Sequence, residues 1–336
     1  MKKIIKKIIP HFVFERLKRL LNLIKLNKNY FNEMRRYSKY SFELTKNKTQ
    51  RHLESNLIFF YHKIEKGLSL PNPRVGFGEK KVYHLLELVK VYYNRFGWDK
   101  TAQVSLNTLF AYYKFNKDHN LDLKDLYIEL EELKKISTNN TTVGGVTNIN
   151  LKDIESARIN FKDFANSRYS LRAFLPGEIP LSKIRESVEI AQKTPSVCNR
   201  QSCKVYVFDK YRKDAILKHQ NGNSGFGKDA DKVLIITANL KDFRGPKERN
   251  QAYIDGGLFS MSIIYALHSL NVGTCALNLS LDYRDEEKLK EDAKIPKSEV
   301  ALMMVALGNF PESFYVTDSP RRNTKDVLKV IDGSSS

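Results

Sequence analysis

The chain has 336 residues, of which 41% are hydrophobic and 28% charged, a composition that is typical of a soluble globular protein and argues against disorder over most of its length. Its formal net charge of +19 predicts attraction to an anionic partner, which could be nucleic acid, a phosphate-bearing cofactor, a phospholipid surface or an acidic glycan. The three cysteines form no CxxC pair and the seven histidines show no metal-binding spacing, so we expect a reducing, cytoplasmic compartment and no zinc site.

Residues 1–40 form a basic segment in which twelve Lys or Arg residues face only two acidic ones. Apolar residues follow the helical spacing i, i+3, i+4, i+7 at Leu17, Leu20, Leu21 and Ile24. We therefore predict a basic amphipathic helix, which either binds an anionic membrane surface through residues 1–28 or packs its apolar side on the protein. Charges interrupt the apolar stretch of Met1–Leu26, so neither a signal peptide nor a membrane span is expected.

Residues 41–136 are predicted to be a mainly helical accessory region. Apolar residues recur on a helical repeat from Leu85 to Tyr92, and Leu121–Lys135 alternates acids with leucines before basic residues at its end. Within this region His62–Gly78 holds two prolines and three glycines, which predicts a shaped loop. That loop could contact a ligand as a lid or serve as a structural connector.

A polar, glycine-rich stretch at residues 137–150 is the best candidate for a linker. Beyond it, helical patterns alternate with β-branched segments that we predict to be strands, at Val205–Phe208, Val233–Ala238 and Ala301–Ala306. We therefore place a domain boundary near residue 150 and assign residues 151–336 to a second domain.

Two motifs in this second domain carry chemistry. Arg168, Ser170 and Arg172 alternate, so in an extended segment their side chains would point the same way and form a row that binds an anion. Taken alone, the row could equally be the solvated face of a strand. About two dozen residues later comes the second motif, Pro195-Ser196-x-x-Asn199-x-Gln201.

Two later elements complete the pattern. Gly256-Gly257 leads into an apolar segment, Leu258–Leu270, that we predict to be a helix, and the strand-like Val305–Pro311 precedes Arg321-Arg322. Together with the two motifs they resemble the nitroreductase family of FMN enzymes, over residues 160–330. The resemblance implies an α+β fold with a central, mainly antiparallel sheet flanked by helices; it does not reach residues 1–150.

The resemblance also implies how FMN would be held. Arg168 and Ser170, with Tyr169 between them, would bind the FMN phosphate and ribityl chain together with Arg321 and Arg322. Guanidinium groups suit this role because they bind phosphate bidentately and remain charged. Arg172 would approach the pyrimidine edge of the flavin, where a cation favours the reduced form, and Lys228 is a second candidate for that position.

In family members the second motif reaches the flavin of the other subunit, which implies a homodimer with a composite site. Pro195, Ser196 and Asn199 would make these contacts, and Asn278 with the backbone of Leu279 would donate an amide to flavin N5. The family's usual Gln-Pro-Trp is here Gln201-Ser202-Cys203, a departure that puts the local packing in doubt.

The implied activity is two-electron transfer by a ping-pong mechanism from NADH or NADPH to an unidentified acceptor, with FMN as cofactor. The sequence has no GxGxxG turn, as expected if the nicotinamide stacks transiently on the flavin. Cys198 lies in the second motif, but no neighbouring base marks it as a catalytic thiol, and we expect a small packed residue. The long accessory region suggests a specialised substrate, with cell-surface polysaccharide biosynthesis as one hypothesis.

The alternative of a different class is a non-enzymatic binding or scaffold protein, with a vestigial flavin fold and a basic surface for a membrane or nucleic acid. Aromatic residues lie among the basic ones at residues 30–40, but no recognised nucleic-acid motif accompanies them.

A last expectation concerns the accessory region. Many nitroreductase-like enzymes cover the flavin with a long excursion before the interface helix, and here only Asn239–Gly257 is available. We expect the N-terminal helices to supply the cover, with the Lys66–Gly78 loop nearest the pocket; the alternative is an independent domain on a tether.

Overall fold

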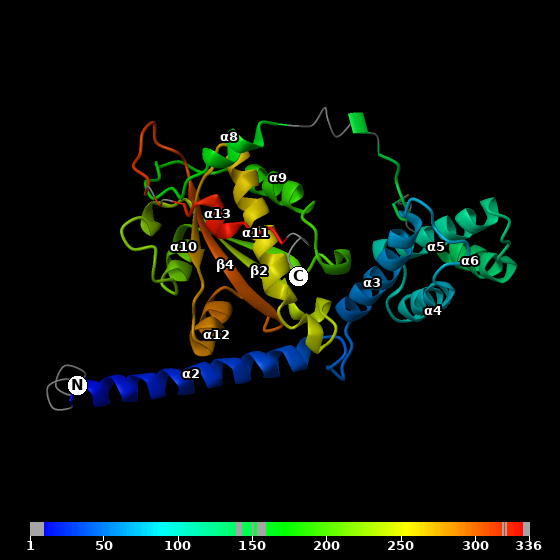
Figure 1. Cartoon of the computed structure of the whole chain (residues 1–336), viewed down its shortest axis with the longest axis horizontal. Coiled ribbons are helices and arrows are strands. Elements are labelled where there is room, and N and C mark those ends of the chain that lie inside the picture. The colour runs from blue at the N-terminus through cyan, green and yellow to red at the C-terminus, as the bar shows by residue number, and fades with distance from the viewer. Residues whose placement is uncertain are drawn as a thin grey trace.

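The computed structural model describes residues 10–138, 143–149, 151–152, 159–317, 319 and 321–331. Figure 1 shows three parts: the long helix α2, a bundle of helices α3–α6, and a sheet with helices on both faces. The N-terminal helices are α2 (His11–Tyr40), α3 (Gln50–Leu68), α4 (Glu79–Phe96), α5 (Lys100–Asp118) and α6 (Lys124–Ile136). Within the described residues, no helix is both long and apolar enough to cross a membrane.

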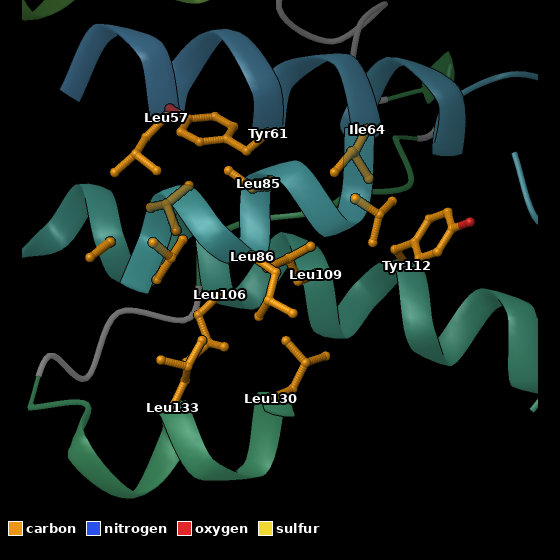
Figure 2. Packing of buried hydrophobic residues seen from close by; sticks show 14 of the residues in the cluster. Leu57, Tyr61, Ile64, Leu85, Leu86, Leu106, Leu109, Tyr112, Leu130 and Leu133 are labelled. Atoms are coloured by element: carbon orange, nitrogen blue, oxygen red, sulfur yellow. The ribbon is translucent and has the colours of Figure 1, made fainter. Parts of the chain in front are cut away.

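The bundle α3–α6 has its own hydrophobic core. Figure 2 shows side chains from all four helices meeting there, among them Leu57, Leu85, Leu109 and Leu130. The amphipathic spacing of α4 and α6 buries one face of each helix, as predicted for the accessory region.

One prediction in the bundle was wrong, because His62–Leu68 is the last part of helix α3 and not loop. A glycine fits in this helix for a steric reason: a Cβ at Gly67 would lie 2.0 Å from the Phe77 ring, so only glycine allows the loop after α3 to fold back on it. The rest of this loop packs on α5, where Tyr112 donates a hydrogen bond to the Phe77 carbonyl at 2.8 Å.

The predicted linker lies partly outside the described residues, at 139–142 and 150. Its described part touches the bundle: Asn107 on α5 donates to the Val143 carbonyl at 2.9 Å, and the Gly145 amide donates to Thr108 Oγ1 at 3.1 Å.

The second region contains the sheet, which has four antiparallel strands in the order β1-β2-β4-β3. The strands are β1 (Cys203–Asp209), β2 (Lys232–Asn239), β3 (Gly273–Asn278) and β4 (Glu299–Gly308). The helices are α8 (Phe161–Asn166), α9 (Leu181–Ala191), α10 (Lys210–Leu217), α11 (Gln251–Ser269), α12 (Tyr283–Asp292) and α13 (Thr324–Val327), and the 3-10 turns are η1 (Val197–Asn199), η2 (Gly227–Asp229), η3 (Leu240–Asp242) and η4 (Pro246–Glu248).

The sheet is buried on both faces: its central strand β2 is buried throughout, and alternate apolar residues of the strand serve two cores. Leu234 and Ile236 pack with α9 and α11, whereas Val233 and Ile235 pack with α10 and the α12 side. The predicted α+β class, with antiparallel strands and a helical N-terminal region, is confirmed.

Helix α11 begins at Gln251, seven residues before the predicted start, so Gly256 and Gly257 lie inside the helix and not before it. A Cβ at Gly256 would lie 2.0 Å from Leu302 Cδ1, and its absence lets α11 approach β4 closely. The connection from β2 to α11 is therefore only Leu240–Asn250.

Candidate functional site

The first motif lies along one edge of the sheet. Ser170 forms a parallel bridge with Thr274 at the start of β3, and the Leu171 amide donates to the Thr274 carbonyl at 2.8 Å. The segment is anchored by Leu171, which is fully buried. Burial raises the pKa of the Cys275 thiol on β3, and the positive charges of Arg172 and Arg168 oppose that shift, which places both guanidinium groups near this strand.

These two arginines have no acidic partner. Within the described residues neither Arg168 nor Arg172 forms an ion pair with a carboxylate, and Arg172 Nη1 makes only a long contact of 3.5 Å with the Ser170 carbonyl. Two unneutralised guanidinium groups at one strand edge are suited to bind an anion.

His268 is a neighbour that the sequence did not reveal. Its Nε2 lies 2.8 Å from Ser167 Oγ, next to Arg168, and its ring lies 5.1 Å from that of Phe164. Burial lowers the pKa of His268, and the charge of Arg168 lowers it further, so the neutral imidazole is favoured beside the anion-binding row. A lone histidine near the end of an apolar helix gives no sequence signal for such a role.

The other residues expected around the flavin are accessible but less constrained. Asn278 ends β3; its carbonyl accepts from Gln220 Nε2 at 3.3 Å and its Oδ1 accepts from the Ser280 amide at 3.2 Å, with half-buried Leu279 between. Lys228 is exposed in η2, and its carbonyl accepts from Lys213 Nζ at 2.6 Å.

Arg321 and Arg322 are also exposed, and Arg321 Nη1 donates to the Ser319 carbonyl at 2.9 Å. In the part of the chain that the structure describes, no hydrogen bond or ion pair joins either residue to the first motif.

The second motif is a loop with a strained backbone. Cys198, Asn199 and Gln201 have φ angles of 50°, 53° and 49°, a region that non-glycine residues rarely adopt. Side chains hold this shape: Ser196 Oγ accepts from the Gln201 amide at 3.0 Å, and the Val197 amide donates to Asp255 on α11 at 3.1 Å. The loop thereby exposes Asn199 and Gln201.

A cavity of 350 Å³ lies between this loop and the N-terminal bundle. Pro195, Ser196 and Gln201 line it from the loop, and Tyr61 and Thr101 line it from α3 and α5. The Lys66–Gly78 loop does not line this cavity, whose wall on the bundle side comes from α3 and α5. The expectation that the loop lies nearest the flavin pocket stays a prediction.

The docking of α3 depends on buried charges. Arg51 on α3 holds the buried carboxylate of Asp242 at 2.8 Å, and Asn56 accepts from Arg244 at 2.6 Å. Burial raises the pKa of Asp242 to about 6, although Arg51 opposes the shift. Helix α3 thus packs on the short connection between β2 and α11.

Arg200, inside the second motif, belongs to this interface. Its guanidinium is buried, lies 2.9 Å from Glu248 and sits over the rings of Phe59 and Phe243 at 5.9 and 5.6 Å. The structure therefore separates Arg200, a structural residue, from its exposed neighbours Asn199 and Gln201.

The two motifs do not meet within one chain. The second motif leads into β1 and the first pairs with β3, and these strands are the two opposite edges of the sheet. Helix α11 runs between them: Asp255 contacts the second motif, and His268 contacts Ser167, which directly precedes the first. Thirteen residues of helix separate these contacts by about 20 Å.

Helix α11 also has an exposed apolar face. Ile254 and Leu258 are 54% and 48% exposed, and half-buried Met261 and Tyr265 continue the same stripe. An apolar helix face is normally buried against another element, so this stripe of α11 is available for a partner.

In the described residues, no group of three or more His, Cys, Asp or Glu side chains could hold a metal ion.

Comparison with known proteins gives one family. Residues 165–222 and 209–309 match the model of the Nitroreductase family, so the match includes both motifs and the sheet but not the N-terminal bundle. A search of curated proteins found no match.

Solved structures with a similar chain path include a Nitroreductase family protein from Streptococcus pneumoniae TIGR4, at 16% identity and a TM-score of 0.45, covering 51% of this chain and 100% of that one. An FMN-dependent nitroreductase from Clostridium difficile R20291 has 19% identity and a TM-score of 0.42, covering 51% and 98%. An FMN- and NADPH-dependent nitroreductase from Sphigopyxis sp. strain HMH has 16% identity and a TM-score of 0.42, covering 51% and 99%. At these scores the similarities carry no argument of their own.

Proposed function

We propose, from the match of residues 165–309 to the Nitroreductase family, that this protein is an FMN-dependent oxidoreductase that moves two electrons from NADH or NADPH to an acceptor in separate half-reactions. When bound, FMN would supply the electron-transfer chemistry, and the protein would supply binding, orientation and electrostatics. The observation that carries the proposal is the row of Arg168, Ser170 and Arg172, whose cations have no acidic partner among the described residues.

Each basic residue has a distinct proposed role. Arg168 and the Ser170 hydroxyl would hold the phosphate and ribityl chain, with Arg321 and Arg322 approaching from the C-terminal segment. Arg172 would place its charge beside the pyrimidine edge and favour the reduced flavin, with Lys228 as the second candidate. Neutral His268 would fix Ser167 and thereby the start of the row. Asn278 and Leu279, at the end of β3, would present a backbone amide to flavin N5.

The site would be completed by a second copy of the chain. If the exposed stripe of α11 packs on the same stripe of a partner around a two-fold axis perpendicular to the helix, the two helices run in opposite directions. The Asp255 end of one α11 then lies near the His268 end of the other, which brings Pro195, Ser196, Asn199 and Gln201 of one chain to the arginine row of its partner. The separation of the two motifs and the exposed Ile254 and Leu258 support this arrangement.

The N-terminal bundle would cover this site. Helix α3 lies on the short β2–α11 connection, and the bundle walls the cavity beside Pro195 and Ser196. A closed wall excludes water and restricts which acceptors can approach reduced flavin. This arrangement is compatible with a specialised acceptor, and cell-surface polysaccharide biosynthesis remains one hypothesis for its source.

Mixing two variants tests the composite site. We expect that Arg168→Ala and Asn199→Ala each bind FMN weakly as homodimers. If the site is shared, each heterodimer contains one intact site, so random exchange of equal amounts should restore about a quarter of the wild-type capacity for FMN. Equilibrium dialysis with FMN measures the binding capacity of the mixture. The control mixture combines Arg168→Ala with Lys80→Ala, a change at an exposed lysine of the bundle.

The possible results lead to different conclusions. No recovery in a mixture of dimers would show that both motifs do not share one flavin. A wild-type protein that binds no FMN at all would reject the oxidoreductase and favour the alternative, a non-enzymatic basic binding protein.

A further inference from the structure

Helix α2 carries the largest run of exposed apolar side chains in the described residues that the proposed dimer does not use. Leu17, Leu20, Ile24 and Phe31 are 46%, 54%, 43% and 54% exposed. At 100° per residue they fall within about 60° of one another, so they form one stripe, which we call the α2 stripe. Exposed apolar surface of this extent indicates an interaction site.

The body of the protein holds α2 by a different face. Asn29 donates to Asp282 at 3.0 Å and accepts from the Tyr283 amide at 3.1 Å, and Arg36 pairs with Glu286 at 2.7 Å. These contacts lie roughly 150° around the helix from the α2 stripe. Figure 1 shows α2 running past α12 and beyond the rest of the molecule. Leu17, Leu20 and Ile24 are therefore turned away from the protein that anchors the helix, whereas Phe31 also borders a hollow that Leu240 and Tyr253 line.

Cations flank the α2 stripe. Arg16 and Lys28 are exposed, lie about 60° to either side of its centre, and form no ion pair within the described residues. Their long side chains can reach outward while the helix lies with its apolar face down. An apolar stripe between basic residues is the pattern of a helix that lies in the plane of an anionic bilayer surface.

Charge also argues against a second copy as the occupant. The chain has a net charge of +19, so a partner copy would on average repel a basic helix. Of the acidic residues outside α2, Asp282 and Glu286 are already engaged by Asn29 and Arg36.

We propose that α2 binds an anionic lipid surface through the α2 stripe and its flanking cations. The rest of the protein then lies on the polar face of α2, on the side away from the lipid. This arrangement would hold the enzyme at a membrane surface without spanning it, and it does not depend on the proposed flavin chemistry.

Vesicle flotation with the full-length protein tests the proposal. We expect binding to vesicles of phosphatidylcholine with phosphatidylglycerol, none to phosphatidylcholine alone, and weaker binding as salt rises. Arg16→Gln/Lys28→Gln should bind about 30-fold more weakly, since each cation near a charged leaflet contributes about fivefold. Lys80→Gln/Lys100→Gln removes the same charge from exposed lysines of the bundle and should leave binding unchanged.

The apolar part is tested at constant charge. Leu20→Gln/Ile24→Gln should weaken binding by at least about tenfold, because two apolar side chains no longer enter the lipid. Val91→Gln/Ile128→Gln, at exposed apolar residues of the bundle, is the matched control. Equal binding of both variants would overturn the proposal. The proposal would also be overturned if Leu20→Gln/Ile24→Gln bound vesicles as the wild type does but no longer sedimented as a dimer. That result would show that a second copy of the chain covers the α2 stripe.

Discussion

Two groups of arginines in this protein have opposite environments. Arg51, Arg200 and Arg244 lie between the N-terminal bundle and the β2–α11 connection, and each contacts a carboxylate. Arg168 and Arg172, along β3, contact none among the described residues. The contrast shows that the neighbouring residues, and not the residue type, distinguish an interface arginine from one that is available to a ligand. An arginine paired with a carboxylate stabilises the fold, whereas an unpaired one can bind an anionic ligand.

The interface group should give the largest effect on stability. Arg51→Ala leaves the buried Asp242 carboxylate without its main partner, which should lower the free energy of unfolding by about 3 to 5 kcal/mol. Urea unfolding measures this change. Arg168→Ala is the matched control and should change the stability of the protein without FMN by less than about 0.5 kcal/mol. An equal loss of unfolding free energy in the two variants would contradict the difference between the two groups of arginines.

The ligand group should give the next largest effect, on cofactor binding. Arg168→Ala and Arg322→Ala should each weaken FMN binding more than tenfold, because a charged hydrogen bond to phosphate contributes about 1.5 to 3 kcal/mol. Fluorescence titration of the protein with FMN is the measurement. Arg249→Ala removes an exposed arginine outside both groups and should bind as the wild type does. Unchanged affinity in both site variants would remove the proposed phosphate site.

The smallest expected effect is a pH dependence of the interface. Because burial raises the folded-state pKa of Asp242 to about 6 from 3.8, its contribution to stability is present below pH 3.8 and is lost as pH rises through 6. Relative to Asp242→Asn, the wild type should lose about 2 kcal/mol of unfolding free energy between about pH 4.5 and about pH 7.5. Parallel pH profiles would show that this carboxylate is not held in a low-dielectric interface.

The sequence by itself determined the helical texture of the bundle, three strand segments and both motifs, whereas the antiparallel pairing was implied by the family resemblance. Period-2 and period-3.6 patterns are local, and an alternating Arg168-x-Ser170-x-Arg172 places three polar side chains on one side of an extended segment. The row alone did not separate an anion site from the solvated face of a strand. Local signals failed where a glycine served packing: Gly67 lies inside α3 and Gly256 inside α11 because each lets another element approach closely.

Only the tertiary structure decided which charged residues are paired with an opposite charge. No spacing pairs Arg51 with Asp242, 191 residues away, or turns the polar face of α2 toward Asp282 and Glu286. These contacts depend on how separate elements pack, as does the distance between the two motifs along α11. The sequence contains the arginines of both groups alike; among the described residues the fold neutralises one group and leaves the other without a carboxylate. A buried charge needs a partner, whereas a site for an anionic ligand needs a cation that no carboxylate occupies.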